Sequence, residues 1–252
     1  MLGPRLVLVM TVAAGTAGGA QPDAAPVVAV TYPGTPAGVP KQEDLAAIRA
    51  LGFNGVEWRP SNRTTFEALT RMVGPLELTI VTGTGVVVDV SIPRPDLQAA
   101  LWRAVARGAK IITLDPGHRT GPGLTTARGD RLPWTYAAST FAGQIASSAR
   151  LFAVARPGPV VTIAAPAPRG VEVALLDGDR AWLLIATNAG RTRATFIARL
   201  PAEVPPALWL SLLDGSNMSM LRESSGPRWT FTIEPGAALV YVIDKAPKLV
   251  SW

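Results

Sequence analysis

The sequence changes its hydrophobic periodicity near residue 157, and this change constrains the fold more than any other feature. Before it, apolar runs that fit buried strands alternate with segments whose apolar residues recur at helical spacing. From Val160 onward the helical spacing is absent, and short runs of alternating apolar and polar residues follow one another. The chain therefore predicts an α/β domain over residues 21–156 and an all-β domain over residues 157–252.

The first domain has the sequence pattern of βα units. Residues 27–30 (VVAV) and 53–58 (FNGVEW) are strand-like, and residues 41–51 between them carry an apolar stripe at helical spacing. The clearest helix covers residues 95–108, which begin with Pro-Asp and end with Gly. Residues 111–115 (IITLD) follow it as another strand. Alternation of strands and helices in this order predicts a parallel sheet.

The second domain has the pattern of an antiparallel sheet. In RWTFTIE, Trp229, Phe231 and Ile233 alternate with threonines, so that one face is buried and the other meets water. Gly- or Asn-containing turns such as DGDR, NAGR and EPGA separate such runs. Six or more short strands in succession predict an antiparallel β-sandwich.

Composition and charge narrow the classes of partner. The chain has 252 residues, 24 basic and 18 acidic, with one His and no Cys. The basic residues are scattered and not clustered along one face, which argues against a nucleic-acid-binding surface. Because there is no Cys, the fold must be held by packing, without disulfides.

The N-terminus has the layout of a secretory signal peptide. One basic residue, Arg5, precedes a short apolar run, and small residues precede Gln21. The apolar run is too short and too interrupted by Gly for a stable membrane span. We therefore expect residues 1–20 to be removed and the protein to be secreted or periplasmic.

Three stretches resemble a known family. DLAAIRALGFNGVEW, LWRAVARGAKIITLD and the C-terminal PGAALVYVI are similar to segments of β-galactosidase-type glycoside hydrolases. The resemblance implies a TIM-like (β/α) barrel followed by a β-sandwich. A complete barrel takes about 250 residues, whereas the barrel-like region runs only from Val27 to Phe152. The expected fold class is therefore α/β plus all-β, with a partial or reduced barrel that lacks its middle units.

The resemblance also implies a pair of catalytic glutamates. Glu77, in LELTIVTG, is the only Glu placed where the nucleophile strand of the family would be, and no Glu matches the position of the acid/base. Glu77 also stands near the start of its expected strand, which is the stability side of a barrel. If the protein is an enzyme, the resemblance implies an O-glycosyl hydrolase.

Carboxylates at strand ends are the candidates for chemistry. A retaining glycosidase holds two carboxyl groups about 5–5.5 Å apart and an inverting one about 6.5–9.5 Å apart. Glu57, Asp89 and Asp115 each stand at or near the end of an expected strand, and Glu57 and Asp115 join Glu77 as candidate catalytic residues. Glu57 is either a sugar ligand or substitute acid, or a solvated strand-end carboxylate. Asp115 either faces a ligand or begins a turn before Pro-Gly.

Aromatic residues and the single His complete the candidate site. We expect substrate contacts from Trp58, His118, Trp134 and Tyr136, with the Trp58 ring as a stacking platform for a sugar. LGFNGVEW also resembles a segment of sugar isomerases and epimerases, whose metal sites usually have several ligands including His. Because this chain has only one His, we expect no metal, and we expect no cofactor.

Two main functions stay open at this point. One is an exported glycoside-hydrolase-like protein that acts on β-linked carbohydrate. The other is a non-catalytic carbohydrate-binding or scaffold protein with the same architecture; the isomerase or epimerase is the third and weakest. A partial barrel exposes unpaired strand edges, so we also expect these edges to pair with another copy of the chain or with the sandwich domain.

Overall fold

The computed structural model describes residues 25–32, 39–58, 63–82, 85–91, 95–117, 123–125, 130–164, 166–204, 208–215, 217–219 and 228–246. They divide between two compact units. The first is formed by Pro26–Arg94 and Lys110–Ala146, and the second by Pro95–Ala109 and Ser147–Trp252, together with the short segment Pro22–Ala25. The segment 1–20, interpreted above as a signal peptide, lies outside the described residues. No helix in the described part of the chain is long and apolar enough to cross a membrane.

A five-stranded parallel sheet with the order β3-β2-β1-β5-β4 organises the first unit. The strands are β1 (Val27–Thr31), β2 (Gly55–Glu57), β3 (Thr79–Val81), β4 (Val86–Asp89) and β5 (Ile111–Asp115). The helices of this unit are α1 (Gln42–Ala50), α2 (Arg63–Val73), the single 3-10 turn η1 (Gly74–Leu76) and α4 (Pro133–Ser147), whose last residue falls in the second unit.

The strand order shows a single direction of winding. From β1 to β2, from β2 to β3 and from β4 to β5, each strand is added on the same side of the one before it. Right-handed crossovers that wind in one direction place their helices on one face of the sheet, as in a (β/α) barrel. Among the described strands β3 and β4 are edges, so this sheet is open. The parallel sheet expected from the sequence is confirmed, and its derivation from a barrel stays a prediction.

The two faces of this sheet differ in chemistry. Register and strand alternation place aliphatic residues on one face. That aliphatic face consists of Val28, Val30, Val56, Ile80, Val86, Val88, Ile112 and Leu114. The opposite face, here called the polar face, carries small and polar residues. It consists of Val27, Ala29, Thr31, Gly55, Glu57, Thr79, Val81, Val87, Asp89, Ile111, Thr113 and Asp115, with the polar residues gathered toward the carboxyl ends of the strands.

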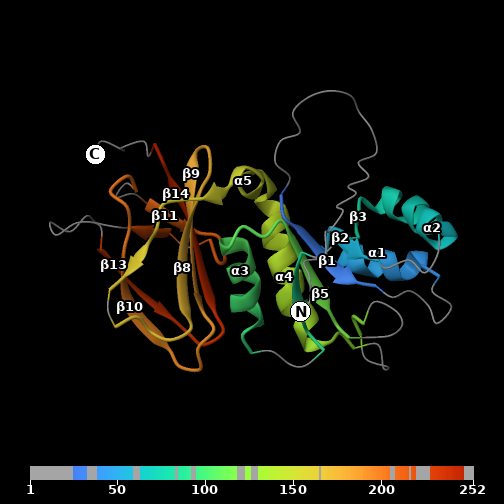
Figure 1. The fold of residues 1–252 in the computed structure, drawn as a ribbon, viewed down its shortest axis with the longest axis horizontal. Coiled ribbons are helices and arrows are strands. Elements are labelled where there is room, and N and C mark those ends of the chain that lie inside the picture. The colour runs from blue at the N-terminus through green and yellow to red at the C-terminus, as the bar shows by residue number, and fades with distance from the viewer. Residues whose placement is uncertain are drawn as a thin grey trace, which may run out of the picture. The chain divides into compact units, whose positions relative to one another are not determined.

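The second unit contains two antiparallel sheets, as the sequence predicts. The smaller has the order β13-β10-β7 and the larger β12-β11-β14-β9-β8-β6; Figure 1 shows β8, β9 and β14 running alongside one another. The strands are β6 (Arg156–Pro157), β7 (Thr162–Ile163), β8 (Val171–Asp177), β9 (Ala181–Asn188), β10 (Ala194–Arg199), β11 (Leu208–Ser211), β12 (Asn217–Ser219), β13 (Arg228–Ile233) and β14 (Ala238–Asp244). The helices α3 (Leu97–Ala106) and α5 (Ala149–Val154) also belong to this unit.

Both antiparallel sheets contribute to one hydrophobic core. Phe196 of β10 and Phe231 of β13 join Leu184 of β9 and Trp209 of β11 in the same buried cluster. The ring centroids of Trp209 and Trp229 are 4.9 Å apart. The alternation predicted from RWTFTIE is confirmed, since β13 alternates between exposed and buried residues along its whole length. Trp182, Trp209 and Trp229 are therefore core residues and not a binding platform.

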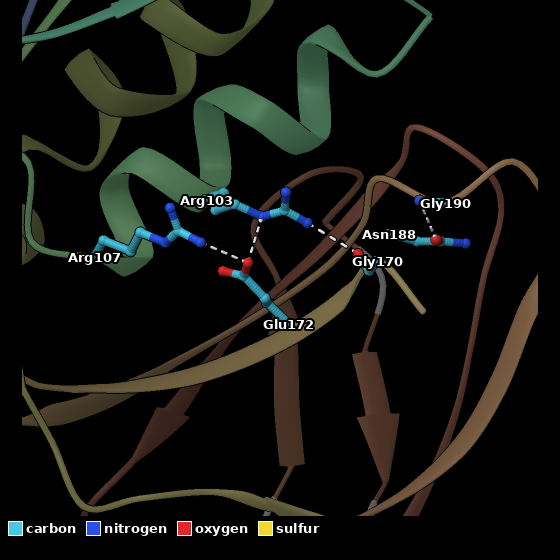
Figure 2. A network of polar contacts seen from close by, with 6 residues as sticks. All are labelled: Arg103, Arg107, Gly170, Glu172, Asn188 and Gly190. Carbon is cyan, nitrogen blue, oxygen red and sulfur yellow. Dashed lines mark hydrogen bonds and ion pairs between the residues drawn. The ribbon is translucent and has the colours of Figure 1, made fainter. Parts of the chain in front are cut away.

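Polar contacts join α3 to the β-strands of the second unit (Figure 2). The Arg107 guanidinium donates to Glu172 of β8 at 2.6 Å, and Arg103 Nε lies 3.2 Å from the same carboxylate. Arg103 also donates to the backbone oxygen of Gly170 at 2.9 Å. The helix that the sequence placed in the α/β domain is thus held by the β-strand unit.

Candidate functional site

Glu57 ends β2 and lies on the polar face at the carboxyl edge of the parallel sheet. Its residue is only 3% exposed, and its Oε2 accepts a hydrogen bond from the hydroxyl of Thr31, its register partner on β1, at 2.8 Å. The alternative that Glu57 is a solvated strand-end carboxylate is therefore wrong. A buried carboxylate held by a neighbouring hydroxyl has a fixed orientation, which a binding residue needs.

Two aspartates extend the same row of residues. Asp89 of β4 and Asp115 of β5 are register partners, and Asp115 follows the pair formed by Val30 and Leu114 along β1 and β5. Along the polar face, the carboxyl edge thus presents Glu57, Thr31, Asp115 and Asp89 in that order. In sheets that wind in one direction, as in (β/α) barrels, ligands bind at the carboxyl ends of the strands, which is where this row stands.

Both aspartates also form turns. Asp115 Oδ1 accepts from the backbone N–H of Gly117 at 2.8 Å, and Asp89 Oδ1 accepts from the backbone N–H of Ser91 at the same distance. The Ser91 hydroxyl donates to Asp89 as well, at 2.6 Å. Each carboxylate is therefore fixed by its own turn, and the turn-forming role considered for Asp115 is part of its structure.

A buried hydroxyl lies beneath Asp115 on the same face. Thr113 is completely buried, and its Oγ1 has no hydrogen-bond partner among the described residues. Burying a hydroxyl without a partner costs free energy, so Thr113 is a polar group that a ligand or water could satisfy. Thr31 and Thr113 were not among the residues selected from the sequence. The polar alternation of Thr113 and Asp115 within IITLD was a signal for Thr113, and Thr31 had no comparable signal.

Trp58 does not form an open stacking platform. It is 2% exposed, and its ring packs against Tyr32 with centroids 5.4 Å apart. The Tyr32 hydroxyl donates to Asp44 at 2.8 Å and accepts from the backbone N–H of Lys41 at 2.9 Å. These hydrogen bonds connect the end of β1 to the start of α1. Trp58 packs against Tyr32 in the core and is not available to a ligand.

Replacing Tyr32 by Phe is expected to destabilise the first unit. Loss of two hydrogen bonds, each contributing about 0.5–1.5 kcal/mol, lowers the free energy of unfolding by roughly 1–3 kcal/mol. Burial is the main cause that raises the pKa of Tyr32 above its ordinary value. The unfolded chain therefore ionises first as the pH rises through about 10, and stability falls there. Urea unfolding at neutral and alkaline pH measures both effects. Tyr136→Phe, at a residue 61% exposed, is the matched control and should change neither the free energy of unfolding nor its decrease at alkaline pH.

Glu77 lies just before the amino end of β3, which is the opposite end of the strand from the carboxyl edge. The strand expected to include it begins only at Thr79, and Glu77 occupies the left-handed turn after η1 with a φ of 53°. Its side chain is 82% exposed and pairs with Arg49 at 3.3 Å. The structure thus places Glu77 before the amino end of β3, away from Glu57, Asp89 and Asp115, in keeping with the stability side of a barrel.

Two of the remaining expected contacts lie on one helix, and the third is not described. Trp134 and Tyr136 lie on α4, where Trp134 is buried and Tyr136 is exposed. His118 lies outside the described residues. Within the described part of the chain, no group of three His, Asp or Glu side chains is arranged to hold a metal ion.

No family model and no curated protein matches this sequence. Similar solved structures include an Anoxybacillus α-amylase (14% identity, TM-score 0.43, 78% of this chain and 39% of that one). They also include a Clostridium acetobutylicum glycoside hydrolase family 30 subfamily 8 xylanase (11% identity, TM-score 0.37, 75% and 48%). A third is a maltogenic α-amylase of Thermotoga neapolitana (10% identity, TM-score 0.44, 76% and 51%).

These neighbours are glycoside hydrolases, but none of the three is of the β-galactosidase type. The chain spans from 39% to 51% of their lengths. At such TM-scores and identities the likeness carries no argument about activity, and any function must rest on the residues of this chain.

Proposed function

We propose that this protein is a glycosidase-like carbohydrate-binding protein, which holds a sugar at the polar face of its parallel sheet without cleaving it. The observation that carries the proposal is the row of Glu57, Thr31, Asp115 and Asp89 above the unpartnered hydroxyl of Thr113. Fixed carboxylates accept hydrogen bonds from sugar hydroxyls, and hydrogen bonds to charged groups are the stronger ones. The β-linked character of the sugar and the export of the protein are part of the same proposal.

Binding without hydrolysis fits this row better than catalysis. Glu57 and Asp115 stand on β2 and β5, which are separated by β1, so their backbones lie about 9.6 Å apart at the usual strand spacing of about 4.8 Å. The distances that define retaining and inverting hydrolases are measured between carboxyl groups and not between backbones, so the hydrogen bonds of the two carboxylates decide between binding and catalysis. Glu57 and Asp115 already accept hydrogen bonds from the Thr31 hydroxyl and the Gly117 N–H, and accepting hydrogen bonds is the role of a sugar-hydroxyl ligand and not of a general acid.

Replacing Glu57 by Gln tests the proposal. A hydrogen bond to a charged group contributes about 1.5–3 kcal/mol, so affinity for the bound sugar should fall about 10- to 100-fold. The Gln side chain can still accept the hydrogen bond from the Thr31 hydroxyl, so the substitution should leave the fold intact. The measurement is isothermal titration calorimetry of the protein against a panel of β-linked oligosaccharides, with Glu77→Gln as the control that keeps full affinity.

Hydrolysis of nitrophenyl glycosides by the same preparations separates binding from catalysis. Turnover that disappears in both Glu57→Gln and Asp115→Asn would replace the binding proposal with an inverting hydrolase. Absence of binding to every member of the panel would overturn the carbohydrate proposal itself.

A further inference from the structure

The outward face of the smaller antiparallel sheet brings two arginines together. Arg199 of β10 and Arg228 of β13 are register partners, and both are exposed. Their neighbours Ala198 and Trp229 point into the core, so the two arginines share the solvent side of the sheet. Cβ atoms of directly opposed residues lie about 4.5–5.5 Å apart, and like charges at that distance destabilise the strand pair.

No described carboxylate offsets this pair of charges. Arg103 and Arg107 contact Glu172 elsewhere in the second unit, and Arg193 contacts Glu234 at 3.2 Å at the far end of the same outward face, six residues along the chain from Arg228. Within the described ranges Arg199 and Arg228 have no such ion pair. The sheet thus keeps an arrangement that costs stability in the isolated protein and that a bound anion would make favourable.

Most of the other side chains on this outward face bear hydroxyl groups. Three register pairs run along it in order, and all six side chains are exposed: Arg199 with Arg228, Ile197 with Thr230, and Thr195 with Thr232. The hydroxyls of Thr195 and Thr232 lie 3.0 Å apart, and Thr162 of β7 flanks Arg199 on its other side. These three register pairs, here called the arginine–threonine face, carry two positive charges and no negative charge, and the Arg193–Glu234 ion pair follows them as the next pair beyond Thr195 and Thr232 on the same side.

We propose that the arginine–threonine face binds an anionic polysaccharide, one that carries carboxylate groups. Guanidinium groups bind carboxylates through two parallel hydrogen bonds, and the threonines can exchange hydrogen bonds with sugar hydroxyls. Nucleic acid fits less well, because the face has no aromatic side chain on which bases could stack. A membrane surface fits less well, because Ile197 is the single large apolar side chain among these exposed residues.

This inference goes beyond the proposed function and uses none of its residues. The carbohydrate site of the first unit binds through carboxylates, which accept hydrogen bonds, whereas the arginine–threonine face binds through cationic donors. A neutral sugar is therefore expected at the first site and a negatively charged chain at the second. An experiment that contradicts one of these two proposals therefore does not contradict the other.

The test measures binding of polygalacturonate by the full-length protein, using affinity electrophoresis and calorimetry. Arg199→Gln and Arg228→Gln should each weaken binding by about tenfold or more, since each removes a charged hydrogen-bonding fork. Arg180→Gln removes the same charge from an exposed site in the turn between β8 and β9, and its affinity should stay within about twofold of the unmodified protein. Neutral dextran should not bind to this face.

Arg228→Glu separates a binding defect from a folding defect. It places opposite charges across β10 and β13, which should raise the melting temperature while binding is lost. Equal losses in Arg180→Gln and Arg199→Gln would mean that net charge alone attracts the polymer, and would overturn the proposal. So would no binding of polygalacturonate, or tighter binding of duplex DNA or anionic lipid vesicles. Glu57→Gln should bind polygalacturonate normally.

Discussion

Trp209→Ala is expected to destabilise the second unit by about 3–5 kcal/mol, the usual cost of removing a large aromatic side chain from a core. Trp209 is completely buried. Its ring centroid lies 4.9 Å from that of Trp229, 5.9 Å from that of Tyr241 and 6.4 Å from that of Phe231. Residues of both antiparallel sheets thus meet at this ring, and its loss opens a cavity that neither sheet can close alone.

Urea unfolding followed by far-ultraviolet circular dichroism measures this effect without relying on Trp209 as the probe. Trp209→Phe keeps an aromatic ring and loses an indole N–H that has no hydrogen-bond partner among the described residues, so it should cost clearly less than the Ala variant. Leu210→Ala, at the exposed neighbouring position, should stay within about 0.5 kcal/mol of the unmodified protein. A Trp209→Ala variant as stable as Leu210→Ala would show that the two sheets do not share this core.

The β-strands of the second unit were predictable because their periodicity is local. In RWTFTIE the alternation of Trp229, Phe231 and Ile233 with polar residues specifies which face is buried, and the structure has that face. The parallel sheet was predictable for a similar reason, since strand and helix patterns alternate through residues 27–115. Local pattern was sufficient wherever one face of an element meets water and the other does not.

The assignment of α3 was not predictable from local pattern. Its apolar stripe, with Leu97, Leu101 and Val105, indicates a helix with a buried face but does not say what that face packs against. Only non-local contacts, such as the contact of Arg107 with Glu172, place it in the second unit. Residues 65 positions apart in the chain make that contact, and no short-range pattern reports it.

The candidate site was predicted in part. The strand-end positions of Glu57, Asp89 and Asp115 follow from local pattern, but their alignment in one row depends on the strand order. The burial of Glu57 and Trp58 was missed, because a Glu-Trp pair at the end of a strand has the same pattern whether or not other segments cover it. Thr31 and Thr113 were missed because threonine is common in strands and drew no attention as a polar group.

Gly236→Ala is the second large effect that we expect, at roughly 2–5 kcal/mol of lost stability. Gly236 has a φ of +73°, and a Cβ at this position would lie 2.1 Å from the backbone oxygen of Pro95. The left-handed conformation costs a non-glycine residue about 1–2 kcal/mol, and overpacking against a fixed backbone costs about 1–3 kcal/mol more. The same residue accepts from Ala99 N–H at 3.0 Å and donates to the Asn188 oxygen at 2.7 Å, so it cannot move away without breaking these bonds.

Gly215→Ala separates the cost of the left-handed conformation from the cost of overpacking. Gly215 has nearly the same φ, +71°, but nothing lies within 4 Å of a Cβ built there. Its replacement should therefore cost only the conformational part, about 1–2 kcal/mol. The difference between the two variants in urea unfolding measures how firmly the turn between β13 and β14 is packed against the start of α3. If the two variants lose equal stability, the segment Pro95–Ala109 is not fixed to the second unit in the way that its backbone contacts indicate.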